Sequence, residues 1–196
     1  MKLYSPALML IASATLVVPA KADCLAEIQG VMQAHLKAGP YHVTMESDMG
    51  GARRSMEIDV ILPSSFHMKA ANMESIMLKE GTWMNMNGKW MAMPGAMSGM
   101  MEQNIKTGMQ GGLKNLSNVQ CEGPQSLEGK TLNKYEMDSS GEAMGIKATS
   151  HITMYTDGQN LPQIMMVDGE AMGHKSHTVQ HIVHDPSITI SPPKLK

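Results

Sequence analysis

The chain has 196 residues, with 16 Lys and Arg against 18 Asp and Glu and a formal net charge of −2. This balance argues against nucleic acid or an anionic membrane surface as the main partner, because basic proteins bind those polyanions. Methionine dominates the apolar composition, with 23 Met against one Phe. Flexible thioethers therefore occupy positions that an ordinary core gives to Leu, Ile and Phe.

Residues 1–22 have the pattern of a secretory signal peptide. Lys2 precedes an apolar run over about residues 7–18, and Ala20-Lys21-Ala22 fits an A-x-A cleavage site. The apolar run is too short to span a bilayer. We therefore expect export to the periplasm, cleavage after Ala22 and no transmembrane segment in the mature protein. The mature chain, residues 23–196, is expected to be one domain with a formal net charge of about −4.

The sequence contains two cysteines, Cys24 and Cys121. Two cysteines in an exported chain predict one disulfide. It would close a loop of close to one hundred residues, which corresponds to roughly 4–5 kcal/mol of stability in the chain-entropy treatment.

The first expected element is an amphipathic helix over residues 24–36, which Gly39-Pro40 would end. After Pro40 the apolar period changes from about four to about two. Short strands with tight turns leave no room for crossover helices and predict an antiparallel meander. Its first strands are expected at residues 41–47, 54–62, 66–71 and 75–80.

Residues 82–93 carry the most specific local pattern. Asn87-Gly88 lies between two alternating segments and favours a type I′ hairpin turn. A two-residue loop sets Met84 opposite Met91 and Asn85 opposite Trp90. Since residues two apart share a face, a wall of thioethers is expected on one face, and Trp83, Asn85 and Trp90 on the other. The wall consists of Met84, Met86, Met91 and Met93.

A second amphipathic helix is expected after Pro94-Gly95. Its apolar positions recur every four residues and are mostly methionine, and Gly111-Gly112 would end it. Further strands are expected at residues 117–121, 131–138, 146–155, 163–167 and 176–184, with the tail 187–196 as a short last strand.

The order of helix, meander, inserted helix and further meander resembles the LolA-like fold of bacterial periplasmic lipoprotein carriers and the related LppX/LprG cell-envelope lipoproteins. The strings that carry the resemblance cover nearly the whole mature chain. They are Tyr41-His42, Leu62-Pro63-Ser64-Ser65-Phe66, Gly81-Thr82-Trp83 with Gly88-Lys89-Trp90, Gly129-Lys130-Thr131 with Tyr135, Tyr155-Thr156-Asp157-Gly158 with Leu161-Pro162, and His184-Asp185-Pro186 with Pro192.

The resemblance implies an α+β fold, in which a curved antiparallel sheet forms an incomplete β-barrel and amphipathic helices cover its concave face. It also implies a non-catalytic carrier or chaperone that binds a lipid or acyl ligand, without a cofactor, and passes it to an envelope acceptor protein. Together with the methionine pattern, it suggests a Met-rich groove. The expected ligand-binding residues are Trp83, Met84, Met86, Trp90, Met91, Met93, Met97, Met101, Ile105 and Met109.

The methionines leave three other interpretations open. They could simply fill the core, because the thioether packs irregular space. They could act under oxidative stress by consuming hypochlorous acid or peroxide, with a methionine sulfoxide reductase as partner to restore them. Thioethers also select Cu(I). The candidate copper ligands are Met84, Met86, Met91 and Met93, with His177 and His181 as a second candidate pair.

Catalysis is not expected. The sequence has no nucleophile elbow, phosphate-binding loop, paired-carboxylate motif or zinc signature. The isolated histidines have no acid–base partner that the sequence identifies. They are His35, His42, His67 and His151.

Overall fold

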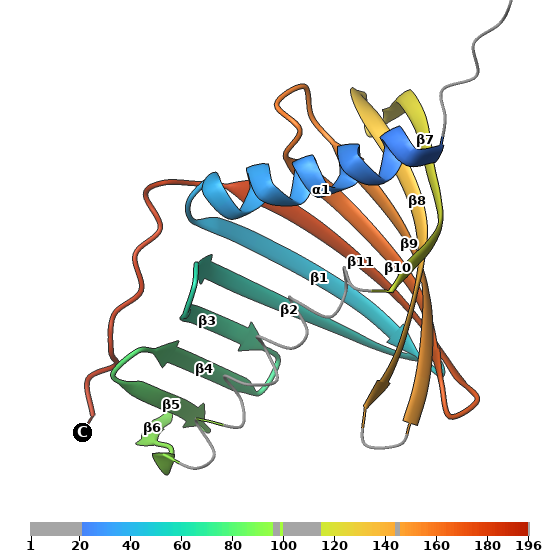
Figure 1. Ribbon diagram of the computed structural model, residues 1–196. Coiled ribbons are helices and arrows are strands. Elements are labelled where there is room, and N and C mark those ends of the chain that lie inside the picture. The colour runs from blue at the N-terminus through green and yellow to red at the C-terminus, as the bar shows by residue number, and fades with distance from the viewer. Residues whose placement is uncertain (1–20, 96–98, 100–114, 144–145, 196) are drawn as a thin grey trace, which may run out of the picture.

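A computed structural model describes residues 21–95, 99, 115–143 and 146–195 of the protein. Within these residues the chain forms helix α1 (Lys21–Lys37) and one antiparallel sheet of eleven strands (Figure 1). The strands are β1 (Tyr41–Met49), β2 (Ala52–Ile61), β3 (Ser65–Ala70), β4 (Met73–Leu78), β5 (Gly81–Met86), β6 (Lys89–Ala92), β7 (Leu116–Leu127), β8 (Lys130–Ala143), β9 (Ile146–Thr156), β10 (Pro162–Ala171) and β11 (His174–His184).

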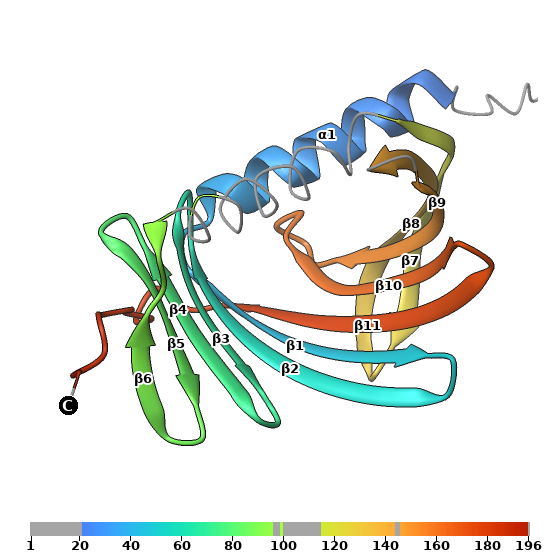
Figure 2. The ribbon, with the colours of Figure 1, turned by 90° about the horizontal axis from the view of Figure 1, so that it is seen from below.

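The sheet consists of two meanders that meet where β1 pairs with β11. The strand order is β6-β5-β4-β3-β2-β1-β11-β10-β9-β8-β7, so β6 and β7 are the open edges. The sheet curves strongly without closing, and α1 crosses its open side (Figure 2). The expected incomplete barrel with an antiparallel meander is therefore confirmed.

The helical part of the expected α+β fold needs correction. The described residues are mostly β, with α1 as their one complete helix. The second expected helix falls almost entirely on residues 96–98 and 100–114, which lie outside the described residues. Two amphipathic helices over the concave face are therefore not confirmed.

The predicted hairpin is confirmed in its turn and its register. Asn87 and Gly88 have φ values of 55° and 81°, the positive values that a type I′ turn requires. Met84 lies opposite Met91, and Asn85 lies opposite Trp90, as expected.

One face of the sheet, here called the inner face, packs against α1. Cys24, Ile28 and Val31 of the helix form a buried cluster with Tyr135 and Met154. Because directly paired residues share a face, the registers across the sheet place a second buried cluster on this same face. It comprises Tyr41, Val43, Val60, Phe66, Met77 and Ile182.

A smaller apolar cluster lies on the opposite face, here called the outer face. Its buried residues are Leu132, Tyr155 and Ile164, and Leu127 packs against them from the end of β7. In the β7–β8 turn, a Glu128 carboxylate oxygen lies 3.9 Å from Nδ1 of His181 in β11. This hairpin end therefore folds over the outer face of strands that it does not pair with.

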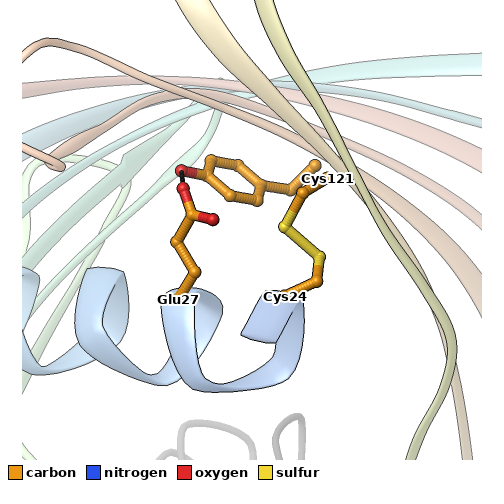
Figure 3. The surroundings of a disulfide bond; sticks show 4 residues. Cys24, Glu27 and Cys121 are labelled. Carbon is orange, nitrogen blue, oxygen red and sulfur yellow. Dashed lines mark hydrogen bonds between the residues drawn. A yellow bond between two sulfur atoms is a disulfide. The ribbon is translucent and has the colours of Figure 1, made fainter. Parts of the chain in front are cut away.

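The predicted disulfide links Cys24 and Cys121. It ties the first turns of α1 to edge strand β7, and the Glu27 side chain points into the same space (Figure 3). Tyr135 donates a hydrogen bond of 2.7 Å to Glu27. A covalent bond and a hydrogen bond thus hold the start of the helix to the inner face.

The expectation of a last strand in the tail is wrong. The described residues after β11, 185–195, form no strand. Residues 189–194 instead line a cavity of about 380 Å³ with His67, Ile76 and Trp90 on the outer face. Pro186, Pro192 and Pro193 remove backbone donors that a further strand would need.

Candidate functional site

Methionine separates almost completely by face. Every methionine on a described strand lies on the inner face except Met166, as the chain of cross-strand registers shows. We call this set the inner methionine surface. It comprises Met45, Met49, Met56, Met68, Met73, Met77, Met84, Met86, Met91, Met137, Met154 and Met165. Met93, just after β6, extends this surface. Its N–H donates a hydrogen bond of 2.8 Å to the carbonyl oxygen of Thr82, which lies on the inner face opposite Met77.

One row of directly paired residues carries this surface across the sheet from β5 to β7. The row is Met86, Met73, Ala70, Met56, Met45, Gln180, Met165, Met154, Tyr135 and Cys121. Its burial changes along its length. Met154 is 1% exposed beneath α1, whereas Met73 and Met86 are 40% and 51% exposed towards edge strand β6.

The exposed fraction of the methionines thus rises from the packed core beneath α1 to an accessible apolar surface near β6, here called the apolar floor. The exposed end includes Met91 at 45%, directly opposite Met84. Unbranched thioethers adjust their rotamers to apolar groups of varied shape, so such a floor can accept chains that differ in length or branching.

The expected ligand-binding residues do not all come together. Met84, Met86, Met91 and Met93 share the inner face, whereas Trp83 and Trp90 lie on the outer face with Asn85. The tryptophans therefore do not belong to the inner methionine surface. The other expected ligand-binding residues lie outside the described residues. They are Met97, Met101, Ile105 and Met109.

The two candidate sets of copper ligands also lie apart. His177 and His181 share the outer face of β11, and the hairpin methionines lie on the inner face. Sulfur and imidazole from these two sets cannot meet at one ion. Among the described residues, no group of three or more His, Cys, Asp or Glu side chains is arranged to hold a metal.

The outer face carries pairs of histidine and carboxylate that the sequence interpretation missed. His42 donates to Asp59 at 2.7 Å, and His151 donates to Asp138 at 2.8 Å. The remaining pairs are His67 with Glu74 and His177 with Asp168. The partners lie on neighbouring strands, so alternation combined with the strand register could have identified them. Each of these histidines therefore has a carboxylate partner on the polar outer face.

A second group of histidines lies where the C-terminal end of α1 meets the sheet. His35, near the helix C-terminus, lies with its Nδ1 3.1 Å from Nε2 of His184 in β11, and both rings contact the ring of Tyr41. Burial, with a smaller contribution from His184, lowers the pKa of His35 from its ordinary 6.5 to about 4. Burial also lowers the pKa of His184. At neutral pH the His35 imidazole is therefore neutral where it meets His184.

We expect acid to destabilise the fold through His35. Unfolded His35 takes up a proton below pH 6.5, but folded His35 does so only near pH 4, so the free energy of unfolding falls between these values. The loss is at most about 3 kcal/mol. Urea unfolding at several pH values should show a shallower pH dependence for His35→Gln than for wild type. Exposed His174→Gln should retain the wild-type slope, and an equal slope in His35→Gln would contradict this account.

Comparison with known proteins shows the fold. No protein-family model matches the sequence, and no curated protein matches it. Mycobacterium tuberculosis lipoprotein LppX superposes with a TM-score of 0.60 at 11% identity, covering 87% of this chain and 99% of LppX. Mycobacterium bovis LprF gives 0.59 at 9% identity, covering 88% and 97%. The chain thus has the LolA-like, LppX-type fold that its sequence resembles. Its described residues include no helix that is long and apolar enough to cross a membrane.

Proposed function

We propose that the protein is an exported, non-catalytic carrier that binds the acyl chains of a lipid on the inner methionine surface. The observation that carries the proposal is the separation of methionine to the inner face, with its exposure rising towards β6. An accessible apolar surface of this kind costs solvation free energy unless a ligand or partner covers it.

The fold supports the same proposal. LppX is itself named a lipoprotein, and the sequence resembles periplasmic carriers whose half-barrel receives acyl chains. The likeness concerns the fold alone, so the ligand class rests on the surface of this chain. In this proposal the signal segment is removed after Ala22 in the periplasm, and residues 23–196 act as one carrier domain.

Native mass spectrometry of the mature protein, taken directly from the periplasm, tests this function. We expect additions with lipid masses that disappear on organic extraction. A bare protein mass under conditions that preserve lipid complexes of a known carrier would contradict the proposal. A copper-sized addition that a Cu(I) chelator removes would replace it with metal handling.

Exposed thioethers favour one second function, the consumption of oxidants. Met172, in the β10–β11 turn, is 73% exposed, and Met49, Met73, Met86 and Met91 are also exposed. Each can take one oxygen from hypochlorous acid to form a sulfoxide, with chloride and a proton as the other products. A methionine sulfoxide reductase would restore them.

The rate at which each methionine oxidises depends on its exposure to solvent. Oxidation rates measured with and without bound lipid can therefore test both functions. In a hypochlorous acid titration followed by peptide mass spectrometry, we expect the exposed methionines to oxidise at least about tenfold faster than buried Met77, Met137 and Met154. Bound lipid should protect Met73, Met86 and Met91 but not Met172. Uniform oxidation in the folded protein would contradict the burial pattern, and equal protection of Met172 would argue against lipid on the inner methionine surface.

A further inference from the structure

Acidic side chains separate by face as sharply as methionine does. The registers of β1–β6 and β8–β11 place every carboxylate whose side chain is described on the outer face. These carboxylates are Glu46, Asp48, Glu57, Asp59, Glu74, Glu136, Asp138, Asp168 and Glu170. The Glu27 carboxylate enters the inner face from α1, where Tyr135 of β8 donates a hydrogen bond to it.

Two permanent cations lie on the inner face of these strands. Arg54 of β2 lies directly opposite Ser47 of β1, and Lys89 of β6 lies opposite Met86. Both are exposed, and neither forms an ion pair with another described residue. By contrast, Arg53 lies on the outer face with its Nε 3.8 Å from Asp48.

The surroundings of Arg54 change from polar to apolar along the strands. Opposite it, Ser47 accepts a hydrogen bond of 3.1 Å from Thr178 of β11. Two residues further along β2 on the same face lies Met56, paired with Met45. Two residues of a strand span about 7 Å, so a guanidinium with neighbouring hydroxyls borders directly on the inner methionine surface.

This arrangement matches the two ends of an amphiphile. Acyl chains would lie on the thioethers, and an anionic head group would meet Arg54 and the hydroxyls of Ser47 and Thr178. Arginine binds phosphate oxygens through charge-assisted hydrogen bonds. No acidic side chain on the inner face of the described strands would repel a head-group anion bound there.

We infer that the ligand is an anionic phospholipid, with its phosphate at Arg54 and Lys89 as a second cation at the edge of the same face. This inference rests on the proposed carrier function and names its ligand class. A lipid whose head group has no net negative charge would use the same methionines but gain less from the two cations.

The test compares lipid extraction from two kinds of vesicle, phosphatidylglycerol and phosphatidylcholine with identical acyl chains. The mature protein is incubated with each kind of vesicle, separated from the vesicles and weighed by native mass spectrometry. We expect wild type to take up phosphatidylglycerol about tenfold better at low salt, with the preference shrinking as ionic strength rises.

Matched variants test whether the preference for phosphatidylglycerol depends on the cations of the inner face. Arg54→Gln/Lys89→Gln should lose the preference, because phosphatidylglycerol uptake falls about tenfold and phosphatidylcholine uptake, in which choline offsets the phosphate charge, falls less. Arg54→Lys should keep most of the preference. The control Arg53→Gln/Lys69→Gln removes the same charge from the outer face and should behave as wild type. Unfolding curves check that each variant is folded.

The outcomes separate this inference from the carrier function. Equal uptake of both lipids by wild type would overturn the anionic ligand and leave the carrier standing. Equal loss of preference in both double variants would overturn the assignment to Arg54 and Lys89, because net charge alone would explain it. No uptake of either lipid would overturn the carrier function and this inference together.

Discussion

Changing Met84 and Met91 together to aspartate is expected to abolish lipid uptake in a folded protein. The two residues are direct cross-strand partners on the inner face, and Met91 is 45% exposed, so carboxylates here can be solvated in the empty protein. A bound acyl chain would strip that water from them, at a cost of several kcal/mol. We expect uptake to fall by at least about a hundredfold.

The controls separate the charge from the loss of sulfur. Met84→Leu/Met91→Leu keeps an apolar floor and should retain uptake. Met172→Asp adds a carboxylate in an exposed turn away from this surface and should also retain uptake. Uptake is measured by native mass spectrometry after incubation with vesicles. Unchanged uptake by folded Met84→Asp/Met91→Asp would rule out the hairpin methionines as the lipid site.

Removing the disulfide should produce the largest loss of stability. Cys24 and Cys121 are 97 residues apart in sequence, so the reduced unfolded chain gains considerable entropy. We expect Cys24→Ala/Cys121→Ala to lower the free energy of unfolding by about 3–5 kcal/mol. Cys24 also belongs to the buried cluster that Ile28 and Val31 form with the sheet, and α1 should become the least protected element in hydrogen exchange.

A control for the disulfide variant lies one helical turn away. Glu27→Gln keeps the disulfide and leaves a hydrogen-bond acceptor for Tyr135, so it should lose no more than about 1 kcal/mol. Urea unfolding of both variants measures the difference. If the double alanine variant unfolds at the same urea concentration and with the same slope as wild type, the link between α1 and β7 does not contribute to stability.

Local chemistry made much of the fold predictable. The Asn87-Gly88 turn sets the pairing of Met84 with Met91, because only a few residues and their φ preferences decide it. The helix before Pro40 and the meander follow from apolar periods near four and two. The pairing of Cys24 with Cys121 was predictable because the sequence has only two cysteines and its N-terminal pattern predicts export, where disulfides form.

The tail shows where local reasoning fails. Residues 187–196 alternate enough to suggest a strand, but their position depends on where β11 ends and on which surface remains open. Residues 189–194 line one cavity with Ile76 and Trp90, which are about one hundred residues away in the sequence. No local propensity encodes such a placement.

The sequence by itself determined which residues share a face, because side chains alternate along every strand. It grouped the hairpin methionines and separated them from Trp83 and Trp90. Only the tertiary structure decided which group faces α1. That choice depends on the direction of sheet curvature and on the β1–β11 pairing, which joins Val43 to Ile182. The same long-range registers set Arg54 beside the inner methionine surface and bring His35 to His184, since distant strands meet only when the whole sheet is assembled.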